Sequence, residues 1–199
     1  INELRFGQKE SSLYLELSRT ASGSLGHGQV MRYFTPSIAQ QEFPGYHIKN
    51  TTPLSISLDF FADHGGMELF SNDIVKPEIF GAMVFARPTL LFGSRNRELK
   101  KMSLAVTWAT DLNAPYQERD DGSFSTSQVQ SMGVDVEYKI YKTKTMDIKS
   151  YVDLSALTYS GGGGIGGAFG TLFRANIISR KTHVFRFRLE GRLSSPGFY

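Results

Sequence analysis

The chain contains no cysteine among its 199 residues, and this absence excludes disulfide bonds, thiol nucleophiles and cysteine-based zinc sites together. It also has no uninterrupted run of about 18 apolar residues, the length that a transmembrane helix needs. A membrane role would therefore have to use strands. The absence of thiols does not identify a redox compartment, because oxidising and reducing compartments both tolerate such a chain.

Helical periodicity is missing as well. No segment of about ten residues or more keeps its apolar residues at the spacing i, i+3, i+4 and i+7. The net charge of +3 is small and evenly spread, which argues against a nucleic-acid-binding protein. The length suits one domain spanning residues 1–199.

Strict alternation of apolar and polar residues is the pattern that is present. It is clearest in THVFRFRLEGRL, from Thr182 to Leu193, where four charged residues alternate with large apolar ones. Successive side chains of a strand point to opposite faces, so this stretch predicts a strand with one charged and one apolar face.

The same alternation recurs between Met102 and Leu112, between Ser131 and Tyr141, and from Ile148 to Ala156. Turn signals such as SGGGG and YKTKT separate the alternating runs. The segment Asn113 to Gln128 contains no such pattern and is predicted to be a long loop. We expect an all-β, antiparallel up-and-down barrel with roughly ten visible strands.

Alternation alone is shared by a soluble barrel, a two-sheet sandwich and a membrane barrel. Three features favour the membrane barrel. The predicted strands run to about ten to fourteen residues, against about five or six in globular sheets. Small residues accompany the charges on the polar faces, and aromatics such as Trp108, Tyr141 and Tyr159 lie near strand ends, where interfacial girdles occur.

Four blocks carry a resemblance to a known group of proteins: SLGHGQVMRYF (Ser24 to Phe34), NDIVKPEIFGAMVFARP (Asn72 to Pro88), TDLNAP (Thr110 to Pro115) and FRLEGR (Phe187 to Arg192). Together they resemble a family of largely uncharacterised bacterial outer-membrane β-barrel proteins. The resemblance implies a porin-like barrel in the bacterial outer membrane, surrounded by outer-membrane lipid. It also implies more strands than this chain contains, so we expect a fragment of a larger barrel.

The alternation assigns residues to two faces of this barrel. The charged set predicted to face the lumen is Arg174, Arg186, Arg188, Glu190, Arg192, Asp135, Glu137 and Lys139. The apolar set predicted to face lipid is Trp108, Val134, Val136, Phe169, Phe173, Phe185, Phe187 and Leu189. The charged set has two interpretations: opposed charges that sort permeating solutes, or neighbouring charges that neutralise one another.

The sequence contains only weak matches to nucleotide-binding, metal-binding and catalytic motifs. Gly162, Gly164 and Gly167 match G-x-G-x-x-G, but a strand pattern follows them where a dinucleotide site needs a helix. The four histidines are isolated and lack metal-ligand spacing. Only His27, near Ser24, lies in a distinctive setting, and no further catalytic partner can be assigned. We therefore expect no cofactor, no metal and no enzymatic activity.

The sequence leaves two functions open. The first is an outer-membrane barrel for the passive passage of small polar solutes, or with a structural role if the lumen is filled. The alternative is a soluble lipocalin-like barrel that binds a small apolar ligand. The sequence predicts neither the oligomeric state nor the solute.

Overall fold

The computed structural model describes residues 3–7, 12–18, 23–25, 31–34, 55–62, 65–88, 98–118, 120, 122, 124–178 and 182–198. Their secondary structure is almost entirely strand, with a short 3-10 turn, η1 (Leu99–Lys101), before β8 (Met102–Glu118). No helix in these ranges is long and apolar enough to cross a membrane.

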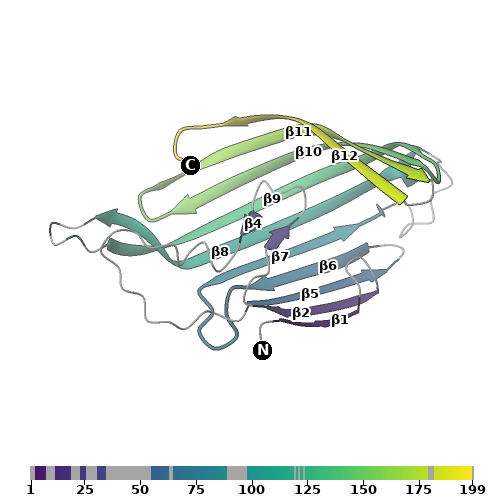
Figure 1. Cartoon of the computed structure of the whole chain (residues 1–199). Helices are drawn as coiled ribbons and strands as arrows, with labels where there is room; N and C mark the ends of the chain where they lie inside the picture. The colour runs from purple at the N-terminus through teal and green to yellow at the C-terminus, as the bar shows by residue number, and fades with distance from the viewer. Residues whose placement is uncertain are drawn as a thin grey trace.

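Ten strands form one antiparallel sheet in the order β1-β2-β5-β6-β7-β8-β9-β10-β11-β12 (Figure 1). Neighbours in the sheet are neighbours in sequence, except that a hairpin is inserted between β2 and β5. The strands are β1 (Glu3–Phe6), β2 (Leu13–Ser18), β5 (Ser55–Ala62), β6 (Gly65–Ser71), β7 (Ile79–Ala86), β8 (Met102–Glu118), β9 (Phe124–Lys142), β10 (Met146–Tyr159), β11 (Gly162–Ile178) and β12 (Thr182–Ser194). This arrangement confirms the all-β, antiparallel up-and-down sheet. The sheet is not closed, because β1 and β12 lie at its two edges.

The inserted hairpin consists of β3 (Gly23–Leu25) and β4 (Met31–Phe34). It pairs only with itself, as a second, two-stranded sheet, and β3 approaches β7. Figure 1 draws the hairpin in front of the middle strands of the curved sheet. Since β7 is already paired with β6 and β8, the hairpin lies against a face of the sheet and adds no strand to it.

The two faces of the sheet have opposite composition. On β10, Tyr151, Asp153 and Ser155 are 2%, 4% and 6% exposed, whereas Val152 and Leu154 between them are 50% and 63% exposed. The neighbouring strands repeat this alternation in register, because Asp153 lies opposite Asp135 and Leu154 lies opposite Val134. We call the face of Tyr151, Asp153 and Ser155 the inner face, and the opposite face the outer face.

Small and polar residues dominate the inner face of the central strands. A curved sheet shields its concave face, and this contributes to the burial of these residues. They are Ala105, Thr107, Ala109, Ser131, Gly133, Asp135, Asp153, Ser155, Gly166 and Ala168. One small apolar cluster interrupts the polar face, formed by Phe70, Met83, Ala105 and Ala109 with Ile79 and Phe85 packed against it.

The segment predicted as a long loop, Asn113 to Gln128, is largely strand. β8 runs 17 residues and β9 runs 19, so both extend into this segment and pair with each other there. The pairing contains register shifts between Asp111 and Ala114 and between Pro115 and Gln117. Such bulges accommodate a proline in a strand, because its missing N–H then interrupts no regular ladder. The prediction of a loop was wrong because Pro115 and the acidic residues after it hide the strand pattern.

Two turns match the sequence more closely. Between β9 and β10, the Thr143 N–H donates to the Met146 carbonyl oxygen (2.7 Å), and the Thr143 hydroxyl accepts a hydrogen bond from the Met146 N–H (3.0 Å). After β12, the Phe198 N–H donates to the Ser195 carbonyl (3.2 Å) around Pro196 and Gly197. The strand therefore ends at Ser194, as the proline and glycine predict.

Candidate binding cluster on the inner face

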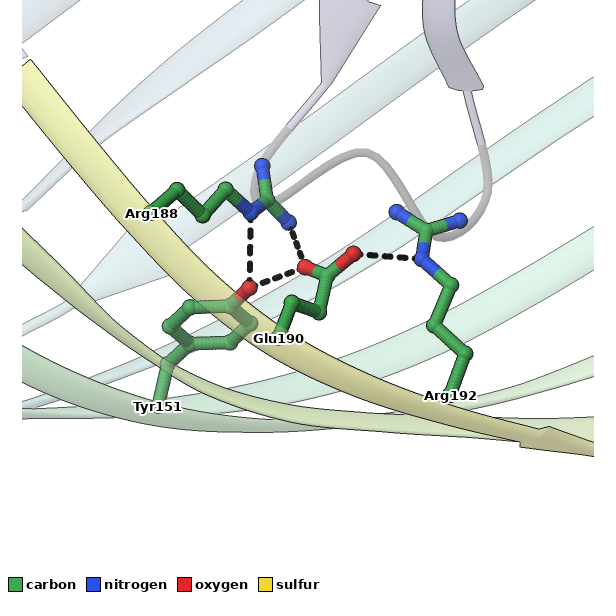
Figure 2. Close-up of polar contacts among 4 residues, drawn as sticks. All are labelled: Tyr151, Arg188, Glu190 and Arg192. Atoms are coloured by element: carbon green, nitrogen blue, oxygen red, sulfur yellow. Dashed lines mark hydrogen bonds and ion pairs between the residues drawn. The ribbon is translucent and has the colours of Figure 1, made fainter.

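A cluster of four polar side chains lies on the inner face where β10, β11 and β12 run side by side (Figure 2). Alternation on β12 places Arg188, Glu190 and Arg192 on one face, and β10 contributes Tyr151. The register explains why they meet: Gly170 of β11 lies opposite Tyr151 on one side and opposite Glu190 on the other. We call these four side chains the arginine cluster.

Glu190 is the centre of the arginine cluster. One carboxylate oxygen, Oε2, accepts hydrogen bonds from the Tyr151 hydroxyl and from Nη2 of Arg188, and the other, Oε1, accepts from Nε of Arg192. Nε of Arg188 also donates to the Tyr151 hydroxyl oxygen at 2.8 Å. The guanidinium carbon of Arg188 lies 5.1 Å from the centre of the Tyr151 ring, within the range of a cation–π contact.

Glycine at position 170 makes room for the tyrosine. A Cβ at this position would lie 2.7 Å from the Tyr151 hydroxyl oxygen and 2.6 Å from the Leu189 carbonyl oxygen. Both distances are shorter than real Cβ contacts, so a side chain at position 170 would displace the ring or the backbone. The Tyr151 ring therefore lies across β11, and its hydroxyl reaches Glu190 two strands away.

The arginine cluster has two cations for one carboxylate. The Glu190 side chain is 10% exposed, whereas the side chains of Arg188 and Arg192 are 26% and 30% exposed. The negative charge is thus enclosed, and the positive groups retain access to solvent. Ion pairs that are partly buried and hydrogen-bonded hold their geometry better than exposed ones.

The other predicted lumen-facing residues fall into smaller groups on the same face. Glu137 pairs with Lys149, with 3.0 Å between Oε1 and Nζ. Lys139 lies opposite Lys149 in the register of β9 and β10, and Asp135 lies opposite Asp153. Arg174 and Arg186 lie opposite each other on β11 and β12, and both are exposed.

The acidic and basic residues belong to neighbouring strands of one wall. Asp135, Asp153, Ala168 and Arg192 form a single cross-strand row from β9 to β12. Three steps between strands separate its ends, about 14 Å at the usual spacing of strands. The structure therefore brings Arg188, Glu190 and Arg192 together and keeps Asp135 apart from them in the same sheet.

The predicted lipid-facing residues are the exposed apolar ones of the outer face. The most exposed five are Val134 (51%), Phe169 (59%), Phe185 (58%), Phe187 (62%) and Leu189 (67%). The remaining three, Trp108, Val136 and Phe173, are half-buried among neighbours on the same face. An open apolar groove of about 770 Å³ also lies on the outer face, between residues such as Val106, Leu154 and Ile165.

Sequence reasoning missed two members of the inner-face site, Tyr151 and Gly170. The position of Tyr151 between Lys149 and Asp153 showed that it shares the polar face, but not that it reaches β12. Gly170 gave no signal apart from its place in a glycine-rich strand. Both roles depend on the register across three strands, which a sequence pattern does not reveal.

A metal site would need several histidine or carboxylate side chains close together in the described part of the chain. No three histidine, aspartate or glutamate side chains there group closely enough to hold a metal ion. His27 lies outside the described residues, and so does the side chain of Ser24.

Comparison of the chain with protein-family models, with curated proteins and with solved structures finds no match. The resemblance to outer-membrane barrels therefore stays a prediction from the sequence.

Proposed function

We propose that this chain forms the wall of a bacterial outer-membrane β-barrel, without enzymatic activity, through which small polar solutes pass passively. The observation that carries the proposal is that the polarity of the two faces is the reverse of that in a soluble barrel. Large apolar side chains occupy the exposed face, and aspartates, serines, threonines and small residues occupy the shielded one. Lipid is the solvent that an exposed apolar face of this extent requires.

Strand length supports the same function. The strands β8 to β12 contain 17, 19, 14, 17 and 13 residues. A strand needs about nine to eleven residues to cross a bilayer at the usual tilt, and strands of globular proteins average about five or six. Each of the five is therefore long enough to cross with residues to spare.

The lipocalin-like alternative receives little support. Such a barrel would hold an apolar ligand against an apolar interior, with polar residues facing water. Here the buried inner face includes Asp59, Asp135 and Asp153, and its one apolar cluster is small. The same feature favours passage over a purely structural role, because a charged, shielded face suits a wet interior.

Phe187→Arg tests the assignment of the outer face. Phe187 lies near the middle of β12 and is 62% exposed. In a membrane barrel an arginine near the bilayer midplane destabilises by about 2–4 kcal/mol, so we expect assembly into lipid vesicles to fail or weaken strongly. In a soluble barrel the same exposed substitution would change stability by about 0.5 kcal/mol or less.

The measurement is the fraction of refolded protein that migrates differently on a gel with and without heating, after incubation with phospholipid vesicles. Phe187→Leu is the matched control, because it keeps the apolar character and is expected to assemble normally. Equal assembly of the arginine and leucine variants, or a wild-type chain that stays folded and soluble in buffer without detergent, would refute the membrane barrel.

A further inference from the structure

We propose that the arginine cluster is a binding site for an oxyanion, the carboxylate or phosphate group of a solute on the inner face. This inference rests on the proposed function and deepens it, because it names the chemical class of the solute that the barrel would favour. It concerns Arg192 as the binding group and Glu190 as the residue that positions it beside Arg188.

The donors of Arg192 are the first argument. A guanidinium carries five N–H groups, and Arg192 uses Nε for its bond to Glu190. Among the described residues, no other partner of Arg192 is found. Figure 2 shows its two terminal nitrogens pointing away from the β12 ribbon. These two nitrogens form a fork of donors on a side chain that is 30% exposed.

Rigidity is the second argument. Long arginine side chains lose conformational entropy when they bind a ligand, which weakens a site built from unrestrained ones. Glu190 holds one guanidinium on each side through charge-assisted hydrogen bonds. Tyr151, set across Gly170, fixes Arg188 a second time at 2.8 Å. The two cations are therefore oriented before any solute arrives.

The balance of charge is the third argument. Two guanidiniums and one carboxylate leave a net charge of +1, and the carboxylate is the least exposed of the three groups. An approaching solute thus meets positive charge, with the single negative group enclosed behind it.

The geometry selects oxyanions over chloride. The planar fork of a guanidinium matches two oxygens of a carboxylate or phosphate group and forms paired hydrogen bonds with them, whereas a spherical ion receives no such pairing. An organic acid and a phosphorylated solute share this chemistry, so the experiment uses acetate and inorganic phosphate as separate probes.

Isothermal titration of the refolded, detergent-solubilised protein in a chloride buffer tests the proposal. We expect measurable binding of phosphate or acetate, and Arg192→Gln is expected to weaken it at least about tenfold. Arg186→Gln is the matched control, since it removes the same charge from the same face of the same strand, and its effect should stay below about twofold. Arg192→Lys keeps the charge but loses the fork, so it should restore only part of the affinity.

Three results would overturn the oxyanion site. They are no binding of either probe above the chloride background, equal losses in Arg192→Gln and Arg186→Gln, and full rescue by Arg192→Lys. The second and third would mean that total charge, rather than the arrangement of the cluster, attracts anions. Gel migration with and without heating verifies that each variant is folded before titration.

Conductance across a planar bilayer separates this inference from the proposed function. If the wild type conducts but Arg192→Gln binds both probes as tightly as the wild type does, the oxyanion site is refuted and the passage of solutes stands. If the chain does not conduct, yet titration shows binding that Arg192→Gln abolishes, the site stands and passage is refuted. The preferred probe identifies the solute class, as carboxylates or as phosphates.

Discussion

On each face of the sheet, a glycine makes room for an aromatic ring from the neighbouring strand. On the inner face the Tyr151 ring lies across Gly170, and on the outer face the Phe169 ring lies over Gly191. A Cβ at position 191 would come within 2.7 Å of the Phe169 ring. Each glycine thus provides the space for an aromatic side chain from the neighbouring strand, so these glycines are packing sites as well as points of backbone freedom.

Gly170→Ala is predicted to destabilise the folded chain by about 1–3 kcal/mol, the usual range for overpacking. The new methyl group would meet both the Tyr151 ring and the Leu189 carbonyl oxygen, and neither can move without disturbing β12. Denaturant unfolding of the refolded protein in detergent or vesicles measures the change. Because Tyr151 would be displaced from Arg188, phosphate and acetate binding should weaken as well.

Gly167→Ala is the control for this prediction. It lies three residues earlier on β11, on the outer face, where a Cβ would meet a methyl group of Leu154 at 3.2 Å. That methyl group ends a flexible side chain and is able to move, so the substitution should destabilise less than Gly170→Ala. The reverse ranking of the two variants would contradict the packing role of Gly170.

The residues of the arginine cluster were only partly predictable. Arg188, Glu190 and Arg192 share a face because alternate residues of one strand do so, and this rule needs no information beyond β12. Tyr151 joins them only because β10 and β12 flank β11 in one particular register. Register between strands arises from packing and turn geometry across the whole sheet, which is why the sequence did not reveal this contact.

Among the elements, the hairpin of β8 and β9 differs most from the expectation. β7 pairs with β8 only between Leu104 and Asp111, and β10 pairs with β9 only from Val129 onward. Beyond these points the ladder of each strand is with the other, although the Leu112 N–H still donates to the Glu78 carbonyl (2.9 Å) and the Ser127 hydroxyl contacts that of Ser160. The alternation of apolar and polar residues predicted the part of each strand that lies within the sheet. Only there do the two faces of the strand have different surroundings, so only there does the sequence alternate.

The projecting part of this hairpin is predicted to be dispensable for assembly. Replacing residues 115–126 with Asn-Gly would join Ala114 to Ser127, which are already cross-strand partners, through a two-residue turn suited to a hairpin. Because the strand pairs described for the removed segment lie within the hairpin, we expect the free energy of unfolding to change by less than about 1 kcal/mol. Unfolding in detergent and heat-dependent gel migration measure the outcome.

A deeper deletion serves as the control for this element. Replacing residues 111–130 with the same turn also removes Asp111 and Val129, which pair with β7 and β10 respectively. Assembly should then fail or weaken strongly. Comparable losses in the short and the deep deletion would mean that the projecting hairpin supports the sheet through contacts of its own.

At the scale of the whole molecule, the open sheet has two unequal edges. β1 has four residues and β12 has thirteen, so β1 is able to cover at most four residues of β12. Within a bilayer, unpaired backbone N–H and C=O groups each destabilise by several kcal/mol, and spanning strands therefore do not leave a bare edge. If the chain spans a bilayer as proposed, a strand additional to these ten is therefore expected to pair with β12.

Amide hydrogen exchange of the protein in lipid tests whether β12 has a partner strand on both sides. A strand with a neighbour on one side only protects every second amide, whereas a strand with neighbours on both sides protects nearly all of them. We expect protection at consecutive residues along β12, as on the central strand β10. The projecting part of the β8–β9 hairpin is the internal control and should show alternate protection, because each of its strands has a single partner. Alternate protection along β12 as well would mean that its edge is bare, and a bare edge of thirteen residues is incompatible with the interior of a bilayer.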